Sequence, residues 1–175
     1  VQIAEVGEQL LAIRYPLSAQ RLVGWCAITG EVLNIADVYQ LDPQLPYRFD
    51  RSVDEHFGYR AVSMLTLPLR STSGEIVGVM QLINRKHDPA ARITPGVASQ
   101  LVRPYDADDQ RLIEALASQA AVCVERTQLF ENQERLIDAI IAILAGAIDA
   151  KSPYTGGHCS RVPELAQMLA KEAAA

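Results

Sequence analysis

One stretch near the end of the chain has residue types that could take part in metal chemistry. It reads AIDAKSPYTGGHCSRV and contains His158, whose imidazole could bind a transition metal. A hydrolytic metal site generally needs about three protein ligands or more. After His158 the chain has no further His and no Asp, and its other histidines, His56 and His87, lie far back in the sequence. On its own, His158 is therefore expected to be an exposed imidazole near the start of a helix.

The composition is typical of a water-soluble globular protein. The chain has 175 residues, 49% of them hydrophobic and 21% charged, which suits one domain plus an appendage. Its net charge of −5 and the lack of any run of Lys and Arg argue against a nucleic-acid polymer as partner. No apolar stretch approaches the roughly 20 residues needed to span a bilayer. Three widely spaced cysteines fit reduced thiols and predict a cytoplasmic location.

The first half of the chain, which would position any site, is predicted to consist mainly of strands and turns. QIAEV and LLAIRY, separated by a Gly-Glu break, predict a hairpin at the amino end. The apolar runs at 61–70 and 75–86 predict two strands joined by the turn STSG. Pro68 lies late in the first run, which indicates a sheet edge or a bulge there.

The segments around these strands are less regular. A short helix or turn is expected to stop at Gly30, followed by a strand at 32–35. Residues 38–58 and 87–105 have no clear periodicity, so both are predicted to be long irregular segments, and the first of them a loop or lid.

From Asp106 the pattern becomes helical, with acidic residues at its start, where they complement the helix dipole. Eleven positions step by alternating three and four residues, and nine of them are apolar: Ile113, Leu116, Ala120, Cys123, Thr127, Phe130, Glu134, Ile137, Ile141, Leu144 and Ile148. Residues 110–126 are expected to pack on the chain's own sheet. For residues 129–148, pairing with a second chain is favoured over packing within the chain, and Gly146 is expected to weaken the far end.

The sequence resembles the GAF domain family of small-molecule sensors. The matching stretches are VGWCAITGEVLNIADVY, FGYRAVSMLTLPLR, GEIVGVMQLINRK and the closing helix YDADDQRLIEALASQAAVCVE. The resemblance covers residues 1–128 and implies an α+β fold, an antiparallel sheet flanked by helices. The family's usual opening helix and first strand are not evident, so a truncated amino end is expected.

The resemblance also implies where a ligand would lie, between the sheet and the segment from 37 to 60. The candidates for lining that space are Asp37, Tyr39, Phe49, Phe57 and Tyr59. The alternative is that these side chains only pack the lid. Arg60 is expected to anchor the lid to the sheet.

Three ligand classes known in the family have weaker support from the residues. Cyclic-nucleotide-binding members carry Asn-Lys, a spacer, then Phe-x-x-x-Asp-Glu, and Asn84-Arg85-Lys86 with the acids at 106–109 is only an approximate version. Cys26 is the one cysteine placed to attach a bilin, but a free cysteine is more often a small buried hydrophobe. His56 or His87 as a haem ligand is weaker still.

The stretch around His158 resembles the start of an HD-GYP domain, a branch of the HD metal-dependent phosphohydrolases. The matching residues are Asp149, Lys151, the run SPYTGGH and Arg161-Val162, with Cys159 where the family usually has Ser. The resemblance implies that His158 is a metal ligand in an intact domain, which would hold a divalent metal pair of the iron or manganese type. The remaining ligands of that domain are absent from this chain, so no cofactor is expected in the fragment itself. VPELAQMLAKEA predicts a short amphipathic helix beginning near Ser160.

Together these features predict a regulatory, non-enzymatic fragment: a GAF-like sensor at 1–128, a helical linker at 129–150 and the start of an HD-GYP domain at 151–175. The resemblance implies that the intact bacterial signalling protein is a cyclic di-GMP phosphodiesterase. The expected partners are an unidentified small molecule and a second copy, paired through 129–150, whose seam would have two packings that the ligand biases. The alternatives are a dimerisation scaffold without a ligand, and a phosphodiesterase active in its own right.

Overall fold

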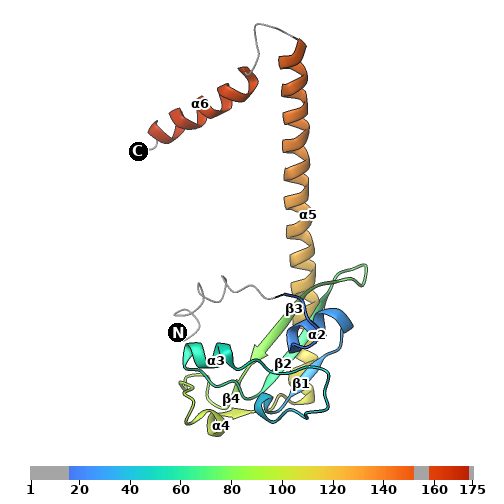
Figure 1. The fold of residues 1–175 in the computed structure, drawn as a ribbon, viewed down its shortest axis with the longest axis vertical. Coiled ribbons are helices and arrows are strands. Elements are labelled where there is room, and N and C mark those ends of the chain that lie inside the picture. The colour runs from blue at the N-terminus through green and yellow to red at the C-terminus, as the bar shows by residue number, and fades with distance from the viewer. Residues whose placement is uncertain (1–15, 152–157, 174–175) are drawn as a thin grey trace. The chain divides into compact units, whose positions relative to one another are not determined.

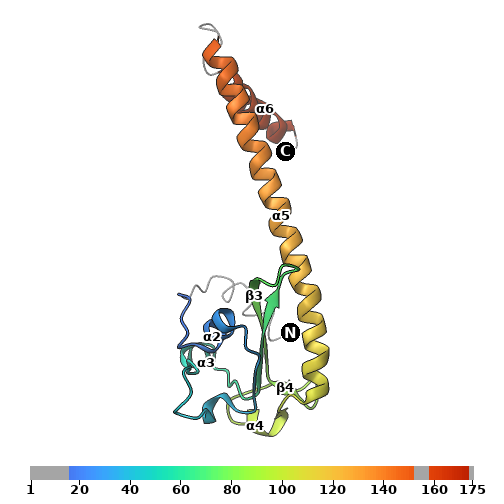
Figure 2. The same ribbon diagram turned by 90° about the vertical axis from the view of Figure 1, so that its right-hand side faces the viewer.

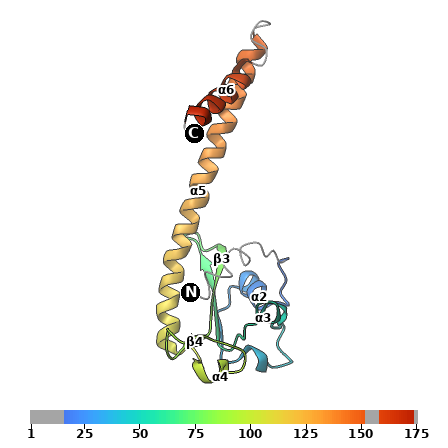
Figure 3. The same cartoon turned by 90° about the vertical axis from the view of Figure 1, so that its left-hand side faces the viewer.

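The computed structural model describes residues 16–151 and 158–173, and it has the α+β fold expected from the sequence. The described chain divides into two compact units, which meet between Glu125 and Arg126. In the first unit an antiparallel sheet is flanked by helices, and Figures 1, 2 and 3 show it from three sides. The hairpin predicted for QIAEV and LLAIRY lies outside the described residues.

Helix α2 (Leu22–Thr29) and strand β1 (Leu33–Ile35) lie where the sequence predicts a short helix followed by a strand. Gly30 ends the helix in the left-handed conformation, with φ of 71°, and its N–H donates to the carbonyl of Cys26 at 2.9 Å. A residue with a Cβ is strained at such a φ, which explains why glycine ends the helix here.

The sheet has the order β1-β2-β3, and all of its pairs are antiparallel. Strands β2 (Met64–Arg70) and β3 (Ile76–Ile83) lie within the predicted runs 61–70 and 75–86, and they are joined by the predicted turn, in which Gly74 has a φ of 88°. The second run is not one strand, because residues 85 and 86 belong to a separate two-stranded sheet. Pro68 pairs with Val79 of β3 but lies beyond the last residue that pairs with β1. The register shifts one residue further on, between Leu69 and Arg70, so an irregularity of the kind predicted lies next to Pro68.

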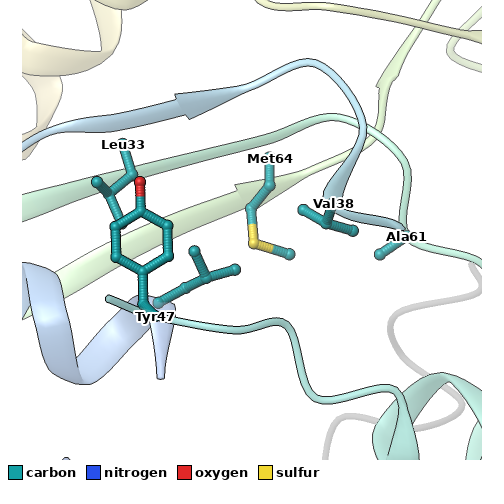
Figure 4. Packing of buried hydrophobic residues seen from close by; sticks show 6 residues of the cluster. Leu33, Val38, Tyr47, Ala61 and Met64 are labelled. Atoms are coloured by element: carbon teal, nitrogen blue, oxygen red, sulfur yellow. The ribbon is translucent and has the colours of Figure 1, made fainter. Parts of the chain in front are cut away.

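The two faces of β2 belong to two different cores. Met64 packs with the first cluster, which also contains Leu22 of α2. Figure 4 shows Met64 lying between Leu33 and Tyr47 on one side and Val38 and Ala61 on the other. Figure 2 shows α2 on one side of the sheet and the first part of α5 on the other.

The second core lies between the sheet and α5 (Ala107–Lys151), which is one helix of 45 residues. Leu65, Leu67 and Leu69 of β2 pack against Ala117 and Ala121 of the helix. Packing of this part of α5 on the chain's own sheet is therefore confirmed.

The positions in contact, however, follow the predicted seam only in part. Leu116 is 51% exposed and Cys123 is also exposed, whereas Ala117 and Ala121 are buried. Small side chains at the contact allow the helix to approach the three leucines closely. Leu116 therefore lies off the line of contact, whereas Ile113 and Ala120 of the predicted seam pack against this core.

The segments predicted to be irregular contain short ordered elements. Residues 38–58 include η1 (Val38–Gln40) and α3 (Ser52–Phe57), so the prediction of one long loop is only partly right. Single hydrogen bonds order these turns: the Asp37 carboxylate accepts from the N–H of Tyr39, and Asp50 accepts from the N–H of Ser52. Residues 87–105 likewise contain a short helix, α4 (Ala98–Leu101), and a short strand, β5 (Val102–Arg103). Strand β5 pairs with β4 (Arg85–Lys86).

Asp106 caps the start of α5. Its carboxylate accepts from the N–H groups of Asp108 and Asp109, and the carboxylate of Asp109 accepts from the N–H of Asp106. This reciprocal pair is a capping box, which explains why the helix begins where the acidic residues predict it. Gly146 does not end the helix, which continues to Lys151.

In the second unit, the residues of α5 from 126 onward are largely exposed, including its large hydrophobic side chains. Helix α6 (His158–Ala173) is the predicted amphipathic helix, but it begins two residues before Ser160. As a result Pro163 lies inside the helix rather than in its first turn. The apolar residues Val162, Leu165 and Leu169 of α6 are exposed.

Substitution of Gly24 tests the close approach of α2 to the preceding loop. A Cβ at this position would lie 2.0 Å from the carbonyl oxygen of Ser18, a backbone atom that cannot turn aside. We expect Gly24→Ala to lower the free energy of unfolding by about 1–3 kcal/mol, measured by denaturant titration. Gly96→Ala is the control, because a Cβ there meets nothing within 4 Å, and it should change stability by less than about 0.5 kcal/mol. Equal effects of the two substitutions would contradict this account.

Candidate ligand site

The segment between β1 and β2 lies against the first core, on the side of the sheet where the family resemblance implies a ligand. Tyr39 and Phe49 are half-buried and pack against the core cluster of Leu33, Val38 and Met64. Their rings contact each other at a tilt, with centroids 5.4 Å apart. Two of the five predicted residues are thus neighbours at the margin of an apolar core.

Tyr39 is the centre of a polar cluster. Its hydroxyl donates to Oδ2 of Asp54 at 3.0 Å. The guanidinium carbons of Arg60 and Arg51 lie 3.7 Å and 4.5 Å from the centre of its ring, within the range of cation–π attraction. Burial raises the pKa of Tyr39, and the hydrogen bond to Asp54 adds to the increase. The phenol therefore stays protonated at neutral pH and acts as a donor.

Asp37 and Arg60 connect this cluster to the start of β2. Asp37 accepts from the N–H of Tyr39 at 2.9 Å and from the side-chain amide of Gln40 at 2.9 Å. A third contact of Asp37 is with the guanidinium of Arg60, at 3.9 Å. Arg60 therefore has the contacts of the anchor predicted for it. Its Nε atom is buried and has no hydrogen-bond partner within the described chain.

Asp54, in α3, was not among the predicted residues, although it is the most buried carboxylate in the described chain. Only 5% of its surface is exposed, and Oδ2 accepts from the N–H of Ala61 at 2.7 Å as well as from Tyr39. Nothing in the local sequence marks it, because its partners lie 7 and 15 residues away and are brought close only by the fold. It joins the lid segment to the strand that follows.

Asn84, at the end of β3, is a second polar connection and was singled out only as part of the Asn-Arg-Lys sequence. It is buried and adopts a left-handed backbone with φ of 63°. Its side-chain oxygen accepts from the N–H of Val62 at 2.7 Å, and its amide nitrogen donates to the Tyr59 hydroxyl and the Arg60 carbonyl, both at 2.8 Å. Tyr59 is thereby fixed beside Arg60, and burial raises the pKa of Tyr59.

The structure therefore brings most of the predicted residues into one network of contacts. Asp37, Tyr39 and Phe49 share direct contacts, and Tyr59 is linked to Arg60 through Asn84. Phe57, the last residue of α3, has its ring contact with His56 instead, edge-on at 4.8 Å. These are the groups that could stack on, or hydrogen-bond to, a small molecule; the same contacts could also only pack the lid.

Arg85 links the end of the sheet to the start of α5. Its guanidinium contacts Asp106 at 2.8 Å and Asp109 at 2.6 Å. The N–H of Asp109 and the Arg85 side chain hold the pKa of Asp106 below its usual range. The Asn-Arg-Lys sequence at the end of the sheet and the acids at 106–109 are thus in contact through this ion pair.

The two cysteines with described side chains differ sharply. Cys26 is fully buried in α2, and burial raises the pKa of its thiol to about 11. Cys123 is exposed on α5. Since the thiolate is the reactive form, Cys26 is poorly suited to covalent attachment of a chromophore.

The described residues contain no group of three or more His, Cys, Asp or Glu side chains close enough to share a metal. His158 is the first residue of α6, and its side chain lies outside the described part of the structure. The donor set within the described ranges does not fit a metal pair, which needs several His and Asp ligands. In those same ranges, no helix is both long and apolar enough to cross a membrane.

Comparison with known proteins identifies the family to which this fold and site belong. The sequence matches the family model for the GAF domain over residues 4–124, more than half of the chain. The chain belongs to the GAF domain family, as its motifs and fold indicate. The matched residues end inside α5, where the helix still packs on the sheet.

The relatives of this chain include two enzymes. Over 123 residues the chain is 28% identical to the dual 3',5'-cyclic-AMP and -GMP phosphodiesterase 11A of Takifugu rubripes, covering 70% of this chain and 12% of that protein. Over 119 residues it is 28% identical to the dual 3',5'-cyclic-AMP and -GMP phosphodiesterase 11 of Drosophila melanogaster, covering 68% of this chain and 7% of that protein. The chain thus spans only about a tenth of the length of these relatives.

The buried carboxylate of Asp54 provides a stability test of the cluster. Asp54→Ala leaves the buried N–H of Ala61 without its acceptor and should lower the free energy of unfolding by about 1–3 kcal/mol. Tyr39→Phe removes only one donor and should cost about 0.5–1.5 kcal/mol. In the double variant the total loss should be smaller than the sum of the two single losses, because both include the same hydrogen bond. Strictly additive losses in urea titrations would show that Tyr39 and Asp54 are not coupled.

The two cysteines provide a chemical test. At pH 8 we expect iodoacetamide to modify Cys123 at least about 100-fold faster than Cys26, since a raised pKa leaves little thiolate and burial blocks access. Peptide mass spectrometry over time measures both rates in one sample. In urea the two thiols should react at similar rates, and equal rates in the folded protein would contradict the described environment of Cys26.

Proposed function

We propose that this chain is the sensory and regulatory part of a larger signalling protein, and that it does not itself catalyse a reaction. Its GAF domain binds a small molecule beside the Tyr39 cluster, and α5 relays the bound state to the domain that follows. The observation that carries the proposal is the continuity of α5, which packs on the sheet through Ala117 and Ala121 and continues as one helix to Lys151. A shift of the strands would therefore alter the packing of α5, the helix that continues beyond the domain.

The ligand proposed for this site is a planar, anionic molecule. Tyr39 and Phe49 offer aromatic faces, and Arg60 offers a cation with one buried N–H that has no protein partner in the described chain. A buried donor without an acceptor is costly, so an incoming acceptor would be favoured there. Cyclic nucleotides have both a flat base and an anionic phosphate, and the names of the two relatives associate them with cyclic AMP and cyclic GMP.

For the intact protein we propose a phosphodiesterase. The relatives' names support that reaction class, and the resemblance of residues 149–162 to an HD-GYP domain supports cyclic di-GMP as its substrate. In that domain His158 would be one ligand of a divalent metal pair, which would supply an activated water for hydrolysis of the phosphodiester. The exposed apolar residues of α6 are those that an intact domain would cover.

A dimerisation scaffold without a ligand is the second candidate, and one observation favours it. The cluster already forms hydrogen bonds within itself and to the backbone: Asp37 accepts from the N–H of Tyr39, and Asp54 accepts from the Tyr39 hydroxyl and the N–H of Ala61. Side chains that only pack a lid would form the same bonds. In that case the GAF domain would contribute α5 and its exposed apolar residues but would sense nothing.

Ligand-dependent thermal unfolding separates the two candidates. The 175-residue chain is heated with cyclic AMP, cyclic GMP or cyclic di-GMP at increasing concentration. A ligand at about 100 times its Kd adds about 2.7 kcal/mol of stability and raises Tm by several degrees. Arg60→Ala should weaken the effective ligand at least tenfold, and Arg111→Ala, an exposed arginine on α5, should leave it unchanged.

Each outcome of this titration favours one candidate. No shift with any of the three nucleotides would remove the proposal of a cyclic-nucleotide sensor and leave the scaffold. A shift that survives Arg60→Ala would place the ligand elsewhere. Hydrolysis of cyclic di-GMP by the chain itself, above the background without protein and with Mn²⁺ supplied, would overturn the assignment of a non-catalytic fragment.

A further inference from the structure

The exposed part of α5 has two apolar seams rather than one. The first seam is the predicted one: Phe130, Glu134, Ile137, Ile141, Leu144 and Ile148. The second seam is shifted back by one residue throughout: Leu129, Gln133, Leu136, Ile140, Ile143 and Ala147. Each has alternating steps of four and three residues, and each has one polar member, at 134 or 133. The nine large hydrophobic residues of the two seams are between 48% and 71% exposed.

Two helices can bury only one such seam at a time between them. A left-handed coiled coil buries the residues at alternating steps of three and four, the a and d positions of a heptad. Neighbouring residues of a helix differ by about 100° around its axis, since a turn has about 3.6 residues. A rotation of about 100° therefore exchanges one seam for the other. Because both have five apolar members out of six, packing alone does not choose between them.

The charges beside the first seam favour a second copy of this chain as the partner, in parallel orientation. In the heptad of this seam Arg126 is at a g position and Glu131 at the following e position. In a parallel pair these positions face each other across the two helices, so opposite charges meet. In an antiparallel pair the e positions would face each other instead, bringing together the acidic Glu131 and Asp138 of the two chains.

Each seam has one feature in its favour and one against it. The first gains the Arg126 and Glu131 contacts but places the two Glu134 carboxylates opposite each other. The second places the neutral Gln133 at that level, which a coiled coil tolerates better than a like-charged pair. Its flanking e and g positions, which include Phe130 and Ile137, carry no charge from 130 to 146, so it forms no ion pairs there.

We propose that residues 126–148 of α5 pair in parallel with the same residues of a second copy, through either of two seams that are one residue apart. The exchange between them is a rotation of the paired helices, with Glu134 and Gln133 setting the balance. The pairing does not depend on the proposed function; only its use as a relay, in which the ligand selects a seam, rests on that proposal.

Disulfide crosslinking between copies tests the two seams. The background variant is Cys123→Ser with Cys159→Ser, which leaves only the buried Cys26. Ile137→Cys reports the first seam and Leu136→Cys the second, and Ala142→Cys, exposed and outside both seams, is the control. With copper phenanthroline we expect both seam variants to form covalent dimers at least tenfold faster than the control. Ile141→Cys and Ile140→Cys form a second matched pair, and circular dichroism at 222 nm verifies that each variant is folded.

Substitution of the two polar residues gives the decisive result. The quantity compared is the crosslinking rate of the Ile137→Cys variant divided by that of the Leu136→Cys variant. Glu134→Gln should raise this ratio at least threefold. Gln133→Lys should raise it as well, because it places like charges opposite each other in the second seam, whereas in the first seam residue 133 is a g position that faces Asp138. No crosslinking above the control in either pair would overturn the dimer. Crosslinking in one seam only, with a ratio that neither substitution changes, would overturn the exchange.

Repeating the crosslinking with and without nucleotide keeps this inference distinct from the proposed function. The crosslinking is first measured without nucleotide, so a failure there is a failure of the seams and not of sensing. Whichever nucleotide shifts the Tm is then added, and the ratio is measured again. A Tm shift without any change in the ratio would retain the sensor and the seams but remove the link between them.

Discussion

Strand β2 is buried on both faces, and the rest of the first unit depends on this constraint. Because successive side chains of a strand point to opposite faces, Met64 contributes to one core while Leu65 and Leu67 contribute to the other. The first core carries the segment with the candidate ligand site, and the second carries α5. A displacement of β2 on one side cannot occur without a change in packing on the other, because protein interiors have few voids to absorb it.

The polar cluster is joined to this strand by main-chain contacts. Asp54 accepts from the N–H of Ala61, and Asn84 accepts from the N–H of Val62, immediately before β2 begins. Buried polar groups are costly when unpaired, so these two side chains restrict how the lid segment can be placed against the sheet. The margin of the core beside Tyr39 is therefore defined by a few strong contacts, and replacing one of them alters several others.

Local patterns were sufficient to predict the longer regular elements, but not the short elements within 38–58 and 87–105 or the contacts that hold the site together. The two long strands, the stop at Gly30 and the start of α5 follow from alternation, turn residues and capping acids, all of which act over a few residues. Asp54 was not predicted, and Asn84 was named only as part of the Asn-Arg-Lys sequence, because their partners Tyr39, Ala61 and Val62 are brought close only by the fold. The seam on the first part of α5 was only partly right for a related reason. Ile113 and Ala120 of the seam pack against the core, but the most buried positions are Ala117 and Ala121, which heptad periodicity did not select.

The same difference explains how one helix can serve two purposes. Where α5 lies on the sheet, its most buried contact residues are small, and the contact depends on a particular surface of the same chain. From residue 126 onward the exposed side chains are large and regularly spaced, and their spacing specifies only another helix with a matching stripe. Two seams of equal apolar content, separated by one residue, would make the exposed part responsive to a small rotation, since neither arrangement has a large advantage to overcome.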